Sequence, residues 1–309
     1  MPKVAVIGAG LIGRSWANVF ARAGWDVTLT DADAATLEAA PALIRAALDD
    51  LAGHGLVADA AGAAGRIKLA RRLAGALEGA EFVQENLPER VEVKTAIFAE
   101  LDRLAAPDTI LASSTSAIVA SRFTESLKGR ARCLVAHPVN PPHLVPIVEL
   151  CGAPWTSPET ITRARAVFEG VGQRPIEVKR EVDGFILNRL QGALLSEAFR
   201  LVGEDYVTPQ DLDDTIRHGL GLRWAFMGPI ETAELNAPEG MRDYCARYAH
   251  SLKSVPLKPA RPDVWDEPNV SRVIAAWGAS PGRAALLKKS EWRDRELAAL
   301  AAHKKRRGV

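Results

Sequence analysis

The hydrophobic pattern at the start of the chain changes once, and the change predicts a strand followed by a helix. Residues 4–7 are continuously apolar, as in a buried strand. They lead into a turn that contains three glycines, Gly8, Gly10 and Gly13. Over residues 16–20 apolar side chains recur instead at helical spacing. The order strand, tight turn, helix is typical of a βαβ unit that binds a nucleotide.

Each of the three glycines has a separate task in such a unit. Gly8 permits the turn, Gly10 lets a pyrophosphate approach bare backbone, and Gly13 lets the helix pack close to the strand. The free N–H groups at the start of the helix then face the phosphates. A glycine-rich turn in another kind of α/β protein is the alternative to a nucleotide site.

A second apolar run, residues 25–30, predicts the next strand and ends at Asp31. A carboxylate at this place accepts hydrogen bonds from both hydroxyls of an adenosine ribose and repels a 2′-phosphate. No Arg or Lys follows it over residues 32–35. The pattern therefore favours NAD over NADP as the cofactor.

Strand-like and helix-like patterns alternate to about residue 180, which is typical of a mostly parallel sheet with helices on both faces. We expect a Rossmann-type doubly wound sheet that forms an NAD-binding domain over residues 1–182. The later strands are predicted over 81–85, 109–112, 132–136, 147–150 and 175–178. The helices are predicted over 34–51, from Pro88 to 104 and over 156–172, with a loop or helical hairpin at 53–65.

From Asp183 the pattern is helical, with no convincing strand, so we expect an all-helical second domain over residues 183–309. Residues 185–202 are apolar nearly all round, which predicts a helix buried on several faces, inside a bundle or across a dimer interface. Prolines between 256 and 268 predict an extended segment before a final helical tail. The basic end, 304–307, is expected to be solvated rather than to bind a partner.

Composition narrows the class of protein. The chain has 309 residues, 48% hydrophobic and 25% charged, which suits two domains with sizeable cores. A formal net charge of +1 creates no field that would gather nucleic acid or an anionic membrane. No run reaches the roughly eighteen apolar residues of a membrane span, and the N-terminus does not resemble a signal peptide.

The three cysteines, Cys133, Cys151 and Cys245, are far apart and odd in number, which gives neither a C-x-x-C metal site nor a disulfide framework. Cys133 lies in an apolar strand-like run, which favours a buried, inert thiol. We expect no bound metal and a reducing, cytoplasmic location.

Ligands of a doubly wound sheet bind beyond the carboxyl ends of its strands, so polar residues near these ends are candidates for the site. Three such residues are Ser116, His137 and Glu149. A fourth candidate is Asn188, which lies in the first long helix of the second domain.

The proline-rich stretch between His137 and Glu149 predicts a stiff, extended turn that brings the carboxylate back beside the imidazole. Such a pair fixes the tautomer of the ring and stabilises the imidazolium, as a general base requires. A buried core histidine is the alternative. Ser116 can cap a helix or contact a substrate. Asn188 is costly to bury without a partner, which argues for a polar ligand or a hydrogen bond across the domains.

Several motifs of the chain resemble those of one enzyme family. They are GAGLIGRSWA, PERVEVK, SSTS, VAHPVNPPHLVPIVEL, EVDGFILNRLQGALLSEAFRLV and GLGLRWAFMGPIE. Together they make the chain similar to the 3-hydroxyacyl-CoA dehydrogenase family as far as about residue 254. The resemblance is closest to the branch that acts on free acids such as L-gulonate.

The resemblance implies a homodimeric, NAD-dependent enzyme that oxidises a secondary alcohol β to a carboxylate. By this likeness His137 removes the hydroxyl proton and Glu149 orients the imidazole. Ser116 and Asn188 would hold the substrate oxygens, and the helical second domain would bind substrate and form the dimer.

The same likeness implies five contacts to the cofactor besides the glycine turn. Leu11, Ile12 and Asp31 would contact the adenosine diphosphate part of NAD. Glu89 and Lys94 would lie near its nicotinamide end.

Two departures bear on the substrate. Acyl-CoA members of the family usually have an asparagine where this chain has Ser114. Arg223 lies in a Gly-flanked turn, where a guanidinium could grip a carboxylate with two parallel hydrogen bonds. A solvated arginine at a helix junction is the alternative.

Three functions follow as expectations. The first is oxidation of the 3-hydroxyl of a small 3-hydroxy acid such as L-gulonate. The second is a short-chain 3-hydroxyacyl-CoA dehydrogenase that acts on 3-hydroxybutyryl-CoA. The third, of another class, is a non-catalytic NAD(H)-binding protein with a structural or sensing role.

Overall fold

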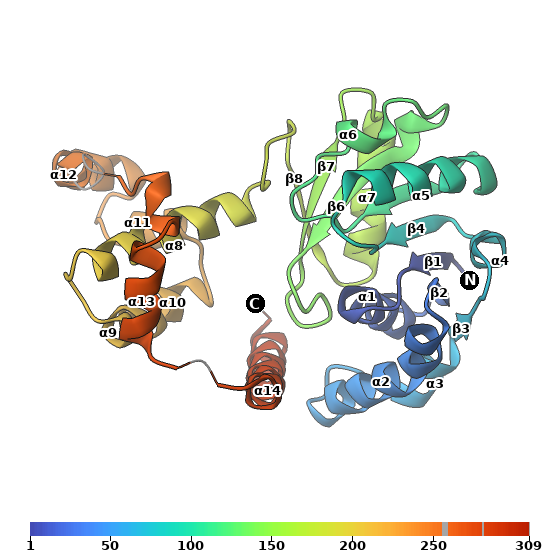
Figure 1. Ribbon diagram of the computed structural model, residues 1–309, viewed down its shortest axis with the longest axis horizontal. Helices are drawn as coiled ribbons and strands as arrows, with labels where there is room; N and C mark the ends of the chain where they lie inside the picture. Colours follow the sequence, from blue (N-terminus) through green and yellow to red (C-terminus); the bar gives the residue numbers. More distant parts are fainter. Residues whose placement is uncertain (255–258, 280, 309) are drawn as a thin grey trace. The chain divides into compact units, whose positions relative to one another are not determined.

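The computed structural model describes residues 1–254, 259–279 and 281–308, and these form two compact units (Figure 1). The first unit joins residues 1–189 to residues 287–308. The second unit lies between these segments, in residues 190–286. Pro256, at the start of the predicted extended segment, lies outside the described residues.

The first unit is built on an eight-stranded sheet with the order β3-β2-β1-β4-β5-β6-β7-β8. Each neighbouring pair in this sheet is parallel except β6 and β7. The prediction of a Rossmann-type, mostly parallel doubly wound sheet is therefore confirmed. The strands are β1 (Lys3–Ile7), β2 (Asp26–Thr30), β3 (Ile67–Leu69), β4 (Phe82–Glu85), β5 (Ile110–Ser113), β6 (Cys133–Pro138), β7 (Ile147–Gly152) and β8 (Arg174–Glu177).

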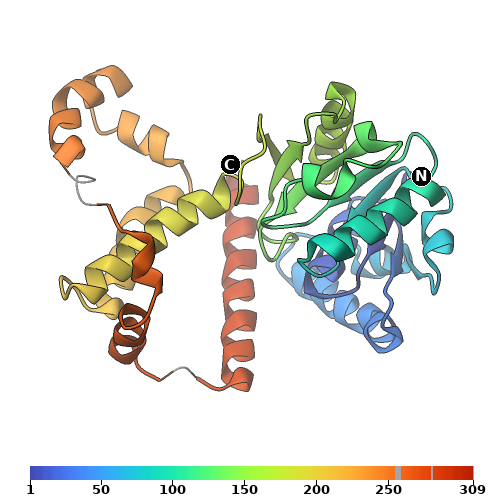
Figure 2. The ribbon, with the colours of Figure 1, turned by 45° about the horizontal axis from the view of Figure 1, so that its top comes forward.

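Helices cover both faces of the sheet (Figure 2), because alternate residues of each central strand enter two separate apolar cores. Val4 and Val6 of β1 join the core under α1, whereas Ala5 and Ile7 join the core under α5. The helices of this unit are α1 (Leu11–Arg22), α2 (Ala34–Gly53), α3 (Ala60–Gly65), α4 (Leu73–Leu77), α5 (Val91–Leu104), α6 (Ser121–Thr124), η1 (Arg130–Arg132) and α7 (Pro158–Gly170).

Two predicted helix starts had different outcomes. Ser157 caps α7 by accepting the Thr160 N–H at 3.1 Å, and Pro158 occupies the first turn as expected. The prediction that Pro88 opens the next helix was wrong, since α5 begins at Val91. Pro88 stays in a turn whose carbonyl accepts the Arg90 N–H at 2.8 Å.

Only helices follow β8 in the described part of the chain, which confirms the predicted all-helical region. The prediction that its first long helix is buried on several faces was wrong for the single chain, where Leu190 is 65% exposed. The helices are α8 (Leu187–Gly203), α9 (Pro209–Thr215), the π-helical turn η2 (Ile216–Leu220), α10 (Gly221–Trp224), α11 (Pro229–Glu234), α12 (Met241–Ser254), η4 (Pro262–Trp265), α13 (Asn269–Trp277) and α14 (Arg283–Arg307).

The last helix, α14, returns to the first unit. Its Ala298 is fully buried there, and the Lys305 ammonium donates to the Gly55 carbonyl at 3.0 Å. Pro262 begins a 3-10 turn rather than extended chain. Within the described ranges, no helix combines the length and the apolar character needed to cross a membrane.

Candidate active site

The glycine turn between β1 and α1 has no space for a side chain at two of its three glycines. Gly8 has φ +95°, and a Cβ on it would meet the Asn86 carbonyl oxygen at 3.0 Å. A Cβ on Gly13 would lie 1.8 Å from the Gly8 carbonyl oxygen, so only glycine permits this approach of helix and turn. Gly10, by contrast, faces open space and caps α1 without a side-chain hydrogen bond. The first N–H groups of α1 are thus available to a pyrophosphate.

Asp31 is held beside this turn by two backbone donors. The Ala9 N–H donates to Oδ2 at 2.6 Å and the Asp33 N–H donates to Oδ1 at 2.9 Å. The carboxylate therefore stands where β2 ends, next to the start of α1. Leu11 is 56% exposed, while Ile12 packs partly against the core. This arrangement fits the adenosine end of NAD.

His137 and Glu149 meet across the one antiparallel strand pair of the sheet. They are direct partners in the β6–β7 register, and Nδ1 of His137 lies 2.8 Å from Oε2 of Glu149. Both side chains are buried, with His137 4% exposed. Nε2 of His137 has no hydrogen-bond partner in the part of the chain that the structure describes. The pair can therefore accept a proton at Nε2 and stabilise the resulting charge.

The second carboxylate oxygen of Glu149 is fixed by the start of α8. The N–H groups of Ile186 and Leu187 donate to Oε1 at 2.9 and 3.0 Å. Burial alone would raise the pKa of the Glu149 carboxyl. The hydrogen bonds from His137, Leu187 and Ile186 outweigh burial and hold this pKa below its ordinary value. Glu149 is thus kept ionised beside the imidazole.

Ser116 is an exposed residue of the loop after β5, and its carbonyl accepts the Asn188 side-chain N–H at 2.9 Å. Asn188 is half-buried, and this hydrogen bond gives its amide a protein partner. Ser116 does not cap a helix, because α6 begins only at Ser121 and is preceded by Ala120. A contact of Ser116 with substrate stays a prediction.

Lys94 and Glu89, the residues expected near the nicotinamide, are held very differently. Lys94 is 1% exposed, and its ammonium donates to both oxygens of Glu85 at 2.9 and 3.0 Å and to the Leu87 carbonyl at 3.0 Å. Its three donors are therefore satisfied within the protein. Glu89 is exposed and accepts hydrogen bonds from Thr115 Oγ1 and the Ala117 N–H.

Glu85 was not among the residues expected from the sequence. It is fully buried at the end of β4 and also accepts hydrogen bonds from Ser113 Oγ and the Leu87 N–H, each at 2.5 Å. The available signal was a run of polar residues, Gln84 to Asn86, at the carboxyl end of a predicted strand. Glu85 and Lys94 together fix the loop that carries Glu89.

Arg223 belongs to α10 of the second unit, where it is exposed. Gly221, two residues earlier, follows a π-helical turn, and a Cβ on it would lie 2.9 Å from the Ile216 carbonyl oxygen. Only glycine permits this close approach without a shift of the backbone. The grip of Arg223 on a carboxylate stays a prediction.

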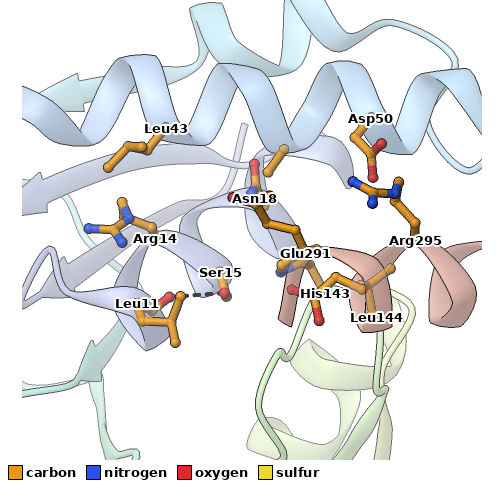
Figure 3. A pocket seen from close by; sticks show the side chains of 12 residues that line it. Leu11, Arg14, Ser15, Asn18, Leu43, Asp50, His143, Leu144, Glu291 and Arg295 are labelled. Carbon is orange, nitrogen blue, oxygen red and sulfur yellow. Dashed lines mark hydrogen bonds between the residues drawn. The ribbon is translucent and has the colours of Figure 1, made fainter. Parts of the chain in front are cut away.

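The first unit also contains a cavity of about 310 Å³ beside α1 (Figure 3). It is lined by residues of α1, α2, the β6–β7 loop and α14 (Figure 3), and neither His137 nor Glu149 belongs to its lining. Polar residues on its wall include Arg14, Asn18, Asp50, His143 and Arg295. Burial, followed by the charge of Arg22, lowers the pKa of His143 to about 4. This histidine is therefore neutral near pH 7.

Two cysteines are buried and unreactive by environment. Burial is the main cause that raises the pKa of the Cys133 thiol and of the Cys151 thiol to about 12. Cys245 is an exposed free thiol. In the described ranges no cluster of three or more His, Cys, Asp or Glu side chains could hold a metal ion.

The doubly wound sheet, the glycine turn and Asp31 define a dinucleotide-binding protein. Residues 3–182 match the profile of the 3-hydroxyacyl-CoA dehydrogenase NAD binding domain, and residues 184–266 match that of the C-terminal domain. The chain belongs to the 3-hydroxyacyl-CoA dehydrogenase family. The predicted cofactor, NAD, is confirmed by this membership.

The chain is similar to three known proteins of different printed names. A lambda-crystallin homolog of Rattus norvegicus is 46% identical, covering 82% of this chain and 80% of its own. An L-carnitine dehydrogenase of Pseudomonas putida is 34% identical over 96% and 92% of the two chains. The crystal structure of the NAD⁺-dependent 5-formyl-3-hydroxy-2-methylpyridine 4-carboxylic acid 5-dehydrogenase has a TM-score of 0.82 and 28% identity, and covers 97% of both chains.

Proposed function

We propose that this enzyme oxidises the 3-hydroxyl of a small free 3-hydroxy acid, of the class of L-gulonate, to the 3-keto acid. One observation carries the proposal. Nδ1 of His137 is bonded to an ionised Glu149, while Nε2 is left to accept a proton. Neither group would need this arrangement if the histidine only filled the core.

His137 is the general base in this proposal. Its Nε2 removes the hydroxyl proton of the substrate, and Glu149 stabilises the imidazolium that forms. Bound NAD would supply the acceptor for the hydride that leaves C3 of the substrate. Ser116 and Asn188, joined by a hydrogen bond, would orient the substrate oxygens. Because Ile186 and Leu187 fix Glu149, the base is oriented before substrate arrives.

The free-acid substrate class is supported by the relatives. The lambda-crystallin branch, to which L-gulonate 3-dehydrogenase belongs, gives the higher sequence identities, and L-carnitine is itself a 3-hydroxy acid. Arg223 would bind the substrate carboxylate through two parallel hydrogen bonds, which a thioester does not reciprocate.

The name of the family favours a second candidate, oxidation of a short-chain 3-hydroxyacyl-CoA. Formation of NADH with L-gulonate, L-3-hydroxybutyrate, L-carnitine and 3-hydroxybutyryl-CoA separates the two. We expect turnover of at least one free acid. Turnover of the thioester alone would end the free-acid proposal, and tight NADH binding without turnover of any hydroxy acid would favour a sensor.

We also propose a homodimer that uses the helical region after residue 183. Three leucines of α8 are exposed: Leu190 by 65%, Leu194 by 38% and Leu195 by 39%. Contact of these apolar side chains with water is unfavourable, and a partner surface would bury them. Analytical ultracentrifugation tests this proposal, and a monomer at micromolar concentration would contradict it.

A further inference from the structure

Ser114 lies where three separate parts of the first unit meet. Its Oγ lies 2.9 Å from the Trp16 indole nitrogen of α1 and 2.6 Å from the Gln84 amide nitrogen of β4. The same oxygen lies 2.7 Å from Oδ1 of Asn86, in the loop after β4. These partners come from positions 98, 30 and 28 residues away along the chain.

The three contacts use the full capacity of the hydroxyl. A serine hydroxyl donates one hydrogen bond and accepts two. The Trp16 indole can only donate, and the Gln84 amide nitrogen also donates, so both acceptor positions of Ser114 are taken. The remaining proton is directed to Asn86. The Ser114 hydroxyl therefore has no donor or acceptor left for a substrate.

Asn86 transmits this contact to the glycine turn. Its amide nitrogen donates to the Ile7 carbonyl at 3.2 Å and to the Gln84 carbonyl at 2.9 Å. Its backbone N–H donates to the same Ile7 carbonyl at 2.8 Å. The Asn86 carbonyl also limits the space at Gly8, as the close approach of an added Cβ shows. The side chain of Asn86 thus holds the base of the turn that faces the cofactor.

The other two partners anchor Ser114 to rigid structure. Trp16 is fully buried in α1, with its ring centroid 5.3 Å from that of Phe168. Gln84 is fully buried in β4, and its amide nitrogen reaches the Ala136 carbonyl at 3.5 Å, one residue before His137. The hydroxyl is therefore held by α1, the helix that follows the turn, and by β4, the strand that pairs with β1.

We propose that Ser114 is a positioning residue for NAD binding. Its hydroxyl fixes Asn86, and through Asn86 it fixes the turn that presents Gly10 and the first N–H groups of α1 to the pyrophosphate. A shift of this turn weakens cofactor binding, because hydrogen bonds to a phosphate depend on the direction of each N–H.

Titration of NADH fluorescence tests this role without reference to the substrate. Ser114→Ala removes the hydroxyl that donates to Asn86 and accepts from Trp16 and Gln84. We therefore expect the Kd for NADH to rise about tenfold. Ser114→Thr keeps the hydroxyl and should restore the Kd to within about twofold of the parent. At saturating NAD the Ser114→Ala enzyme should keep most of its kcat, with the loss confined to the KM for NAD.

Thr124→Val is the matched control. In the parent, the Thr124 hydroxyl also accepts an indole N–H, from Trp155 at 3.0 Å, and donates to the Ala120 carbonyl at 2.8 Å. Unlike the Ser114 hydroxyl, it makes no hydrogen bond to Asn86 or to the glycine turn. Thermal unfolding of both variants reports the structural cost. If both lower the melting temperature and only Ser114→Ala raises the Kd, the positioning role stands.

Asn86→Ala tests the same link from the other side, should Ser114→Ala fail to fold. We expect Asn86→Ala to weaken NADH binding, and the double variant to be little worse than either single change, as for residues that act through one contact. An unchanged Kd in folded Ser114→Ala or Asn86→Ala, or an equal rise in Thr124→Val, would overturn the proposal.

Discussion

Glu149 is the direct cross-strand neighbour of His137, and its Oε2 lies 2.8 Å from the ring Nδ1. Antiparallel pairing places side chains opposite each other on one face, so the backbone itself sets the orientation of the imidazole. The imidazole and the carboxylate are thus held by two adjacent strands of one sheet.

The first prediction concerns His137 as general base. His137→Ala should lower kcat about 100-fold to 10,000-fold, because it removes the proton acceptor and leaves the glycine turn unchanged. Steady-state kinetics measure the loss, and an NADH titration should give the parent Kd. A kcat within about threefold of the parent would show that another group takes the proton.

The second prediction concerns the charge of Glu149. Its pKa is below the ordinary value, so the ionised carboxylate stabilises the folded state above the ordinary carboxyl pKa and ceases to do so as the pH falls through the lowered one. Glu149→Gln should therefore be less stable than the parent near neutral pH, and the difference should shrink in acid. Urea unfolding at several pH values measures this.

Glu81→Gln, at an exposed carboxylate, is the control for Glu149→Gln. A stability difference for Glu149→Gln that stays constant with pH would contradict the assignment.

The third prediction separates two glycines of one turn. Gly13→Ala should destabilise the protein by about 3 kcal/mol or more, because the new Cβ would lie 1.8 Å from a backbone oxygen. Gly10→Ala should fold normally, since its Cβ meets nothing within 4 Å, yet bind NADH about tenfold more weakly where the pyrophosphate needs the space. Thermal unfolding and NADH titration distinguish the two, and equal effects of both changes would refute the assignment.

The fourth prediction concerns His143. Burial, then the charge of Arg22, lowers its pKa to about 4 from 6.5, so the unfolded chain binds a proton that the folded chain does not between these values. The parent should lose up to about 3 kcal/mol of stability from this group as the pH falls from 6.5 to 4. His143→Gln should reduce that loss, whereas His250→Gln, at an exposed histidine, should not. If the stability of His143→Gln fell with pH as steeply as that of the parent, the prediction would be contradicted.

The fifth prediction concerns recognition of the acid. Arg223→Ala should raise the KM for a free-acid substrate about 10-fold to 100-fold, as loss of a charged pair of hydrogen bonds implies. Arg217→Ala removes an exposed arginine of the neighbouring π-helical turn and should leave KM unchanged. An unaltered KM in Arg223→Ala would remove the proposed carboxylate contact.

Local patterns were sufficient to predict the parts of the fold that local chemistry determines. Gly8 and Gly13 are required by the backbone itself, as the close contacts of an added Cβ at these two positions show. The pairing of His137 with Glu149 was predictable from the short proline-rich connection between them, because a short, stiff connection places the two strands side by side.

Contacts between segments that are far apart in the chain could not be predicted from local sequence patterns. Ser114 meets Trp16 across 98 residues, and neither residue carries a local signal of that contact. The position of Lys94 near the nicotinamide end of NAD stays a prediction, whereas its buried ion pair with Glu85 was not predicted from the sequence. The three residues of β3 are too few to show a period, and α14 buries only small side chains, Ala298 and Ala302.

The return of α14 to the first unit makes that unit discontinuous in the gene product. No uninterrupted stretch of polypeptide contains all of it, because residues 287–308 come after the whole of the second unit. A shortened protein that stops at residue 189 would expose to water the apolar core residues that Ala298 covers. Anyone isolating the nucleotide-binding half would need to supply this helix separately or fuse it through a linker.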